Sequence, residues 1–476
     1  MERRPSFSLS FLPIVVLVTL QVAVITHFGS DALNGPSQLG LLTAAAVAVF
    51  LAVWRCGCNY ERLEKALGEA VHQVAVPMVL LLLIGAMGGV WMVSGVVPYL
   101  IHAGLHIISP AIFLPTACLL CAIVSLLTGS SWTTIATIGV ALLGIGDANG
   151  FGQGWIAGAI ISGAYFGDKL SPLSDTTILA SSSCHVPLFT HINFMLRTTI
   201  PSITLSLIIF AVASLLMTTS GAGHVDEYIH GLEQNYCLSH WLLVVPAFTA
   251  FLIYKRLPSI VVMSLSALSA VAIGTLVQSE AIDRLTPGNL FMDLVQSLVG
   301  ETQIQTGNAS LDALLCTRGM SGMLNTIWLI LCAMIFGGVM TESRMMETFV
   351  ARLLRMVDSV TSLVSTTILS GLLCNIVVGD QFLSIVLNAS LYKDKYKQMN
   401  LPRRLLSRSV EDSATVTSAL IPWNSCGLTQ STVLGVATYT YLPYCFFNIL
   451  SPLMSILITA LTRKRYFTSI VADEVA

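Results

Sequence analysis

Five acidic residues lie inside or beside apolar stretches that would otherwise read as membrane spans: Asp168, Asp175, Asp380, Glu411 and Asp412. An ionised carboxylate at the centre of a span costs about 2.5 to 3.5 kcal/mol on insertion scales, so each of these residues needs a partner or a function. Carboxylates in such a setting can hold a small cation or a proton.

The first acidic cluster, residues 167–177, combines two carboxylates with Lys169, Pro172 and four hydroxyl side chains. Proline removes a backbone donor and clashes with the preceding turn, so the helix is expected to unwind here and expose carbonyl oxygens. Carbonyl, hydroxyl and carboxylate oxygens together suit a small alkali cation. A loop at the membrane surface is the alternative, but the apolar flanks favour a site within a span. The candidate ligands are Asp168, Ser174, Asp175 and Thr176.

The second acidic cluster, residues 409–417, carries adjacent carboxylates at Glu411 and Asp412. Two neighbouring carboxylates in a low dielectric resist double ionisation, so one of them is expected to hold a proton. The alternative is a helix cap near the cytoplasmic face, with Arg408 as a simple ion-pair partner. Further oxygen donors in or after this cluster are Ser413, Thr415 and Asn424.

Two apolar stretches, residues 110–147 and 359–392, are too long for one crossing of about 20 residues, and each is broken by polar residues near its middle. Each is either two crossings or one re-entrant hairpin, and the short half-segments favour hairpins. Helix ends at such tips direct dipoles and free backbone groups at an ion. The tips therefore add four candidate ligands: Thr128, Ser130, Ser131 and Asp380.

Other chemically notable residues are interpreted as structural. Five histidines near predicted interfaces are expected to be solvated rather than to relay protons: His72, His102, His106, His185 and His191. Trp132 and Trp423 are expected to pack, and the 11 cysteines to be small buried hydrophobes. No metalloprotease motif and no nucleophile with a base is present, so we expect no enzyme and no cofactor.

These residues must be positioned by a membrane protein, because 55% of the 476 residues are hydrophobic and only 10% are charged. An ordinary soluble chain has roughly 25% charged residues. The net charge of -2 offers no basic face for a nucleic acid. About ten spans are predicted, near residues 11–29, 38–54, 72–93, 155–180, 196–218, 240–254, 257–277, 322–341, 411–430 and 434–461.

Basic clusters define the topology, because cytoplasmic segments carry the excess of Lys and Arg. The clusters near residues 3–4, 55–65, 255–256, 344–355, 393–408 and 463–465 all fall inside if both broken stretches are hairpins, or if each crosses twice. Both termini are then cytoplasmic. Residues 344–358 alternate apolar and basic side chains, which predicts an amphipathic helix lying on the inner surface.

A weak internal repeat divides the chain into residues 1–230 and 231–476. Gly88-Gly89-Val90 resembles Gly337-Gly338-Val339, and Gly129 corresponds to Gly379. Ser174-Asp175-Thr176 resembles Glu411-Asp412-Ser413. Each half then contains three spans, a hairpin and two spans, and the odd number of crossings makes the halves point in opposite directions. The predicted fold is an all-α polytopic membrane protein with inverted repeats, the layout of a secondary transporter.

The same motifs resemble the NhaC family of Na⁺/H⁺ antiporters. The similar stretches are residues 128–134, 167–177, 379–387, 411–427 and 441–444, with Ser130 and Ile178 differing from the family pattern. The resemblance implies exchange of Na⁺ for protons, and some members resemble carriers that exchange organic acids such as malate and lactate. It also implies a fold similar to the dicarboxylate/sodium symporters, in which two hairpins meet two unwound helices.

The mechanism expected from these observations is competition. Asp175, Asp412 and Asp380 bind either Na⁺ or protons at a site exposed alternately to the two faces of a cell inner membrane. The transported ions and the lipid bilayer are then the partners, and a homodimer is a further option. The alternative is an organic-acid exchanger of the same fold, with Arg197 as a candidate carboxylate partner. A channel fits the pseudo-symmetric halves less well.

Overall fold

The computed structural model describes residues 5–217, 222–278, 290–302, 311–312, 315–355 and 357–468. In these ranges the chain is helical apart from turns, loops and one isolated bridge between Thr302 and Thr317. Nine of the described helices are long and apolar enough to cross a membrane, or up to eleven if each of two bent pairs counts as one span. The prediction of an all-α polytopic membrane protein is confirmed.

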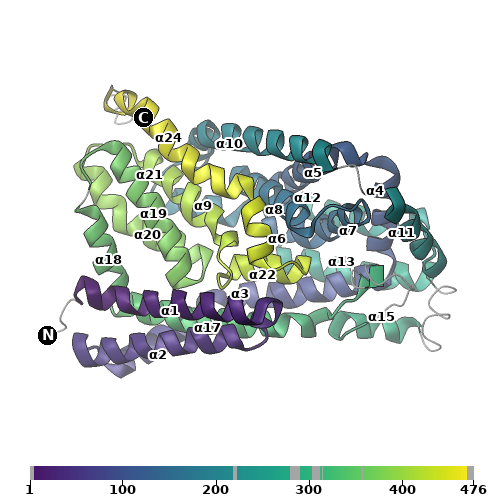
Figure 1. The fold of residues 1–476 in the computed structure, drawn as a ribbon, viewed down its shortest axis with the longest axis horizontal. Coiled ribbons are helices and arrows are strands. Elements are labelled where there is room, and N and C mark those ends of the chain that lie inside the picture. Colours follow the sequence, from purple (N-terminus) through teal and green to yellow (C-terminus); the bar gives the residue numbers. More distant parts are fainter. Residues whose placement is uncertain are drawn as a thin grey trace.

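Long helices lie along the long axis of the molecule (Figure 1). One layer consists of α1 (Phe7–Phe28), α2 (Pro36–Cys56), α3 (Tyr60–Val93) and α17 (Leu324–Glu342), and α17 packs on both α2 and α3. At the opposite edge, α10 (Leu188–Met217) packs on α24 (Phe446–Thr468). Shorter and broken helices fill the space between these two layers.

The remaining elements fall into three sets. The first is η2 (Pro110–Ile112), α5 (Phe113–Thr128), α6 (Ser131–Thr134), the π-helix η3 (Ile135–Gly139), α7 (Val140–Ala148), α8 (Gln153–Leu170) and α9 (Asp175–Ser183). The second is α18 (Met345–Leu354), α19 (Val360–Val378), α20 (Gln381–Gln398), α21 (Arg403–Val410), the π-helix η6 (Glu411–Thr415), η7 (Ser418–Leu420), α22 (Ser425–Leu434), α23 (Thr438–Tyr441) and η8 (Leu442–Tyr444). The third is η1 (Gly29–Leu33), α4 (Val96–Ile107), α11 (Ala222–Asn235), η4 (His240–Leu243), α12 (Val244–Tyr254), α13 (Ser259–Val277), α15 (Leu290–Val299) and η5 (Gly319–Met323).

The two long apolar stretches break where their polar residues predict. Gly129 ends α5 with φ +69°, and Gly379 ends α19 with φ +71°. Glycine adopts this left-handed conformation without the penalty that a Cβ imposes. The next residue caps the following helix in each case, because Ser130 accepts a hydrogen bond from the Thr133 amide and Asp380 accepts one from the Leu383 amide. The two tips therefore share one local geometry.

Two helices are also unwound at matching places. Residues 171–174 separate α8 from α9, and residues 421–424 separate η7 from α22; each break has proline as its second residue. Ser174 caps α9 and Asn424 caps α22. The predicted unwinding around Pro172 is confirmed.

The predicted residue pairing of Ser174-Asp175-Thr176 with Glu411-Asp412-Ser413 is wrong. Ser174 caps the helix that follows its break, whereas Glu411 to Ser413 lie in a π-helix that precedes the other break. The capping residues pair Ser174 with Asn424 instead. The prediction matched the two segments by their acidic residues. Proline and capping residues, not charge, define where a helix restarts.

Two predicted spans differ in form from the expectation. The span near residues 240–254 is the 11-residue α12, preceded by η4 and bent by 96° from the segment Val225–Asn235. The span near residues 434–461 is divided, with a bend of 52° between Thr438–Tyr444 and Phe446–Thr462.

The predicted helix in residues 344–358 exists as α18, but its apolar face does not lie in lipid. Met345, Met346, Phe349 and Val350 are buried in the protein. The ring centroid of Phe349 lies 5.5 Å from that of Phe7 on α1. The amphipathic pattern therefore reflects packing against α1 and α17, which the sequence pattern alone does not distinguish from a membrane surface.

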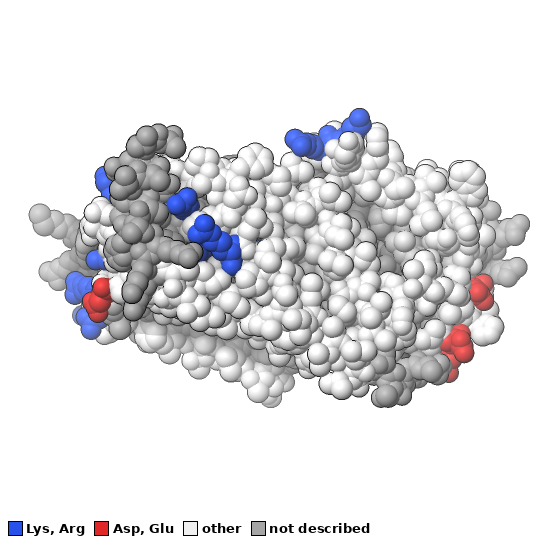
Figure 2. Space-filling view, turned by 90° about the horizontal axis from the view of Figure 1, so that it is seen from above, with Lys and Arg blue, Asp and Glu red and all other residues white. Residues whose placement is uncertain are grey.

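Charge is distributed unevenly along the long axis. Figure 2 shows most of the visible Lys and Arg towards the left, at the end where Figure 1 places both termini, with a further group near the middle of the upper edge. Figure 1 also places α19 and α20 in the half that carries the termini and α7 in the other half, with α6 near the middle. The two broken stretches therefore approach the centre from opposite ends.

Candidate functional site

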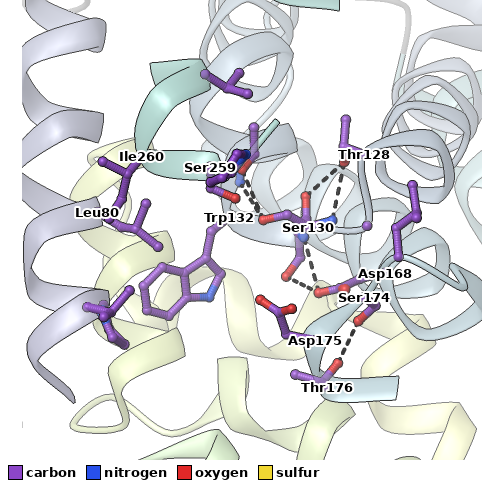
Figure 3. A pocket seen from close by; sticks show the side chains of 18 of the residues that line it. Leu80, Thr128, Ser130, Trp132, Asp168, Ser174, Asp175, Thr176, Ser259 and Ile260 are labelled. Atoms are coloured by element: carbon purple, nitrogen blue, oxygen red, sulfur yellow. Dashed lines mark hydrogen bonds between the residues drawn. The ribbon is translucent and has the colours of Figure 1, made fainter. Parts of the chain in front are cut away.

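A cavity of about 720 Å³ lies where both tips meet the first unwound helix. Its walls come from α3, the first tip, the break between α8 and α9, the loop between α12 and α13, and the second tip. The polar residues that line it are Gln73, Thr128, Ser130, Ser131, Thr133, Asp168, Ser174, Asp175, Thr176, Arg256, Ser259 and Gln381. Figure 3 shows the two carboxylates among hydroxyl side chains beside Trp132.

Asp168 is held at the first tip. Its Oδ2 accepts hydrogen bonds from the Ser131 amide at 3.1 Å and from Ser131 Oγ at 2.7 Å. The side chain is only 6% exposed. The last turn of α8 thereby contacts the first turn of α6, so the tip and the unwound helix form one unit.

Asp175 begins α9, and its side chain is exposed to the cavity. Among the described residues, none forms a hydrogen bond or an ion pair with its carboxylate. Its neighbours Ser174 and Thr176 share a hydroxyl hydrogen bond of 2.9 Å. Asp175 therefore presents carboxylate oxygens to whatever occupies the cavity.

The hydroxyls of the first tip are also in the cavity wall. Ser130 Oγ accepts from the Thr133 amide and from Thr133 Oγ1 at 3.0 Å. Thr128 Oγ1 lies 3.3 Å from Thr134 Oγ1. These contacts fix the hydroxyl oxygens, and the structure brings all three predicted tip residues, Thr128, Ser130 and Ser131, together with Asp168 and Asp175.

Asp380 lies behind the second tip instead of in the cavity wall, which Gln381 supplies. Its carboxylate accepts from the Leu383 amide at 3.0 Å and from Ser425 Oγ at 3.1 Å. The Ser425 amide in turn donates to the Gly379 carbonyl at 2.8 Å. Asp380 therefore fastens the second tip to the second unwound helix.

The remaining predicted donors of the second half also lie outside the cavity wall. Asn424 Nδ2 donates to the Asn375 carbonyl at 3.2 Å, and Ser413 Oγ donates to the Ser409 carbonyl at 2.7 Å. Thr415 Oγ1 is buried and has no hydrogen-bond partner among the described residues. The structure does not bring these three residues into the group around Asp175.

Asp412 forms a buried ion pair with Lys169, in which Lys169 Nζ donates to Asp412 Oδ1. Ser451 Oγ donates to the same oxygen at 3.1 Å, and Arg408 Nε lies 3.8 Å from Oδ2. Lys169 and Asp412 are both fully buried. Sequence reasoning assigned no role to Lys169; the available signal was a lysine within a predicted span, next to Asp168.

Glu411 is fully buried, and neither of its carboxylate oxygens has a hydrogen-bond partner among the described residues. Its Oε2 lies 3.9 Å from His191 Nε2. The prediction that His191 is solvated is wrong, because α10 begins at Leu188 and packs this side chain against α21, where Nδ1 lies 2.9 Å from Ser407 Oγ. The other four histidines are exposed or partly exposed, as predicted.

Arg256 was also missed as a cavity residue. It sits in the loop between α12 and α13 with a positive φ of 57° and lines the cavity. The sequence shows it only as one member of a short basic pair, so nothing local separates it from an ordinary topogenic charge. Arg197, the predicted carboxylate partner, does not line the cavity; it is exposed beside Phe194.

Comparison with known proteins identifies the family of this chain. Residues 5–182 and 163–462 match the Na⁺/H⁺ antiporter family. The Na(+)/H(+) antiporter NhaC of Alkalihalophilus pseudofirmus is 36% identical, over 89% of this chain and 88% of that protein. The arginine/ornithine antiporter ArcD of Halobacterium salinarum is 33% identical (98% and 94%), and the malate-2H(+)/Na(+)-lactate antiporter of Bacillus subtilis is 31% identical (91% of each). The chain therefore belongs to the Na⁺/H⁺ antiporter family.

Proposed function

We propose that this protein exchanges Na⁺ for protons across a membrane. The observation that carries the proposal is the pair of carboxylates in one cavity: Asp175 with oxygens turned to the open space, and Asp168 fixed at the first tip. Relatives named as Na⁺/H⁺ antiporters support the same substrate. In this proposal the cavity binds a transported ion and not a cofactor.

Competition between the two ions couples their movements. Na⁺ is held by Asp175, Asp168 and the tip hydroxyls, whose hard oxygens suit it. A proton on either carboxylate removes the negative charge that Na⁺ needs. Because each ion excludes the other, a carrier that opens alternately to the two sides moves one kind of ion inward only when it moves the other outward.

In this proposal the acidic residues of the second half do not bind Na⁺ directly, because none of them lines the cavity. Asp380 positions the second tip, which brings Gln381 to the cavity. Asp412 holds Lys169, the neighbour of Asp168, and so links the cavity to η6 and α24. Glu411, buried without a hydrogen bond among the described residues, is the proposed second proton carrier.

The architecture proposed for transport is a pair of inverted halves, residues 1–230 and 231–476, in the cytoplasmic membrane with both termini inside. The equal geometry of the Gly129 and Gly379 tips and the paired proline breaks support the two halves. The concentration of Lys and Arg near the termini supports the orientation (Figure 2). A homodimer is the proposed assembly to test by cross-linking in membranes.

The direct test is Na⁺-dependent proton movement in inverted vesicles, reported by a pH-sensitive dye. We expect Asp175→Asn to abolish the response, because the amide keeps the size of the side chain but not its charge. Asp394→Asn, which neutralises an exposed acid on α20, is the matched control and should leave the response unchanged. Wild-type-like exchange by both Asp175→Asn and Asp168→Asn would remove the site.

An organic-acid exchanger is the second candidate, because the cavity is large enough for a small organic molecule and Arg256 can pair with a carboxylate. Radiolabelled malate and lactate uptake with and without a Na⁺ gradient separates the two candidates. Carboxylate exchange predicts gradient-driven uptake that Arg256→Gln abolishes. Plain Na⁺/H⁺ exchange predicts no uptake of either acid.

A further inference from the structure

Glu411 and His191 face each other in the protein interior, outside the cavity wall. Both side chains are fully buried, and Glu411 Oε2 lies 3.9 Å from His191 Nε2. Neither of these two atoms has a hydrogen-bond partner among the described residues. Buried polar atoms are almost always paired, so each group is expected to satisfy the other. A movement of about 1 Å brings the two atoms within hydrogen-bond distance.

The hydrogen bonds of Ser407 assign the proton on His191. Ser407 Oγ lies 2.9 Å from His191 Nδ1 and donates its only proton to the Arg404 carbonyl at 3.2 Å. The Ser407 oxygen therefore accepts a hydrogen bond from Nδ1–H. Because a neutral imidazole carries one proton, Nε2 then presents a lone pair to the Glu411 carboxyl group. Two bare acceptors would repel each other, so a proton must lie between them.

The charges around Glu411 indicate which group holds that proton. Besides Glu411 itself, the buried ionisable groups found here in the described chain are Lys169, Arg408, Asp168, Asp412 and the thiol Cys184. The two cations and the two carboxylates cancel in charge. Arg404 is partly exposed, so water screens its charge. An ionised Glu411 would therefore add an unbalanced charge where solvation is weak, which favours the protonated carboxyl group.

We propose that Glu411 and His191 form a proton-holding pair that serves transport from a place separate from the Na⁺ site. The proton lies on Glu411 and points to His191 Nε2. On transfer, the O–H bond of the carboxyl group breaks and an N–H bond forms at Nε2, which leaves a carboxylate and an imidazolium ion. Neither residue lines the cavity, so Na⁺ in the cavity does not displace this proton by occupying its place.

The position of His191 gives the proton a short way to the surface. The residue lies in the first turn of α10, directly after the exposed Phe189 and Thr190. A proton on the imidazole is therefore within one helical turn of exposed residues, whereas Glu411 lies deeper, in the π-helix η6. Single-turn π-helices occur often at functional sites.

The coupling of this pair to Na⁺ rests on the proposed function. Asp168, a proposed ligand of Na⁺, acts electrostatically on Glu411, and Lys169 is paired with Asp412. Na⁺ bound at Asp168 adds positive charge near Glu411 and so favours release of its proton. By linkage, a proton on Glu411 weakens the binding of Na⁺ to the same extent.

The test is infrared spectroscopy of the purified protein in lipid nanodiscs, in the region of the C=O stretch of protonated carboxylic acids. We expect one band to disappear in Glu411→Gln and to remain in the matched control Glu347→Gln, which replaces an exposed glutamate on α18. Isotopic labelling of glutamate carboxyl carbons should move this band in the wild-type protein, which assigns it to a glutamate without a substitution. A spectrum of Glu411→Gln that retains every wild-type band overturns the proposal.

The partner is tested at His191. His191→Leu removes the acceptor and should move the Glu411 band to higher frequency, whereas His72→Leu, at an exposed histidine on α3, should leave it in place. His191→Asn, whose shorter amide lies farther from Glu411, is the second variant and should move the band in the same direction. A band at the wild-type frequency in every folded His191 variant overturns the pair.

A further measurement separates the pair from the proposed exchange. Protons released when Na⁺ is added to the protein in detergent are counted with a pH-sensitive dye. Glu411→Gln should release fewer protons per protein than the wild type, and Glu347→Gln should release the wild-type number. Equal release by Glu411→Gln overturns the coupling. A wild-type protein that releases none contradicts Na⁺/H⁺ exchange, and the infrared band then still decides whether the pair exists.

Discussion

At the scale of single residues, the ion pair of Lys169 and Asp412 is a buried contact between the two halves of the chain. Both side chains are fully buried, and Ser451 Oγ also lies 2.8 Å from Lys169 Nζ. Removing one partner of a buried pair leaves an uncompensated charge, which costs about 3 to 5 kcal/mol, whereas removing both is close to neutral. Single and double variants of this pair therefore show whether the two side chains act through their charges or only through packing.

We predict that Lys169→Met destabilises the protein by about 3 kcal/mol, the low end of the range for breaking a buried pair, because Asp412 keeps only Arg408, whose Nε lies 3.8 Å away. Lys169→Met with Asp412→Asn should recover part of that loss, because the buried negative charge is gone but Arg408 then loses its carboxylate. Thermal unfolding in detergent, followed by loss of soluble monodisperse protein, measures both. A double variant as unstable as the single one would show that the pair is not energetically coupled.

Some residue roles could be predicted from the sequence and others could not. The local sequence is enough to recognise the acidic residues, Gly129, Gly379 and Pro172. A charge within an apolar run, or a residue that breaks a helix, has its effect over only a few positions. The partner of Asp412 lies 243 residues away, and no local pattern specifies such a contact. The same reason hides Arg256, whose place in the cavity depends on how α13 packs against α3.

At the scale of elements, the tips fit closely against the unwound helices. A Cβ on Gly129 would lie 2.7 Å from the Leu173 carbonyl carbon, which is backbone and cannot turn aside. Gly57 has the same φ of +69° but no atom within 4 Å of such a Cβ. The two glycines thus share a backbone conformation and differ in what surrounds them.

We predict that Gly129→Ala abolishes exchange and that Gly57→Ala preserves it. Both substitutions incur the left-handed penalty of about 1 to 2 kcal/mol, but only Gly129→Ala forces the first tip away from the break that carries Asp175. Proton flux per quantity of reconstituted protein is the measurement. Equal activity in the two variants would show that close contact between tip and break is not required.

The elements themselves were largely predictable. Apolar length and polar interruption placed both breaks. The π-helix at Glu411–Thr415, which packs against α19 and α20, was not predicted, because no local sequence pattern marks it. The helix α18 was foreseen with the wrong neighbour, since an apolar face binds protein or lipid equally well by pattern alone.

At the scale of the whole molecule, the charge distribution supports the proposed side of the membrane for each end. The termini and most visible Lys and Arg share one end (Figure 2), and Cys237, in the link between α11 and η4, is exposed. The proposed orientation puts Cys237 outside and the loop between α12 and α13, which borders the cavity, on the cytoplasmic side.

We predict that a membrane-impermeant maleimide labels Cys237 in intact cells and labels a cysteine at Ser259 only in inverted vesicles. The Ser259→Cys substitution is made together with Cys237→Ser, and Na⁺ is expected to slow its labelling by occupying the cavity. Gel shift after labelling gives the result. Labelling of both positions from the same side would contradict the placement of these two segments on opposite sides of the membrane.

The distance in sequence between Lys169 and Asp412 has a consequence for biosynthesis. At about 5 to 20 residues per second, the ribosome needs roughly 12 to 50 s to make the 243 residues that separate them. During that interval a lysine in the last turn of α8 has no counter-charge, which makes stable burial of that turn in lipid unfavourable. The first half is therefore expected to remain at the insertion machinery, or to keep its α8 end near the headgroups, until Asp412 has been made. A nascent chain arrested before Asp412 should accordingly be cleared by membrane proteases.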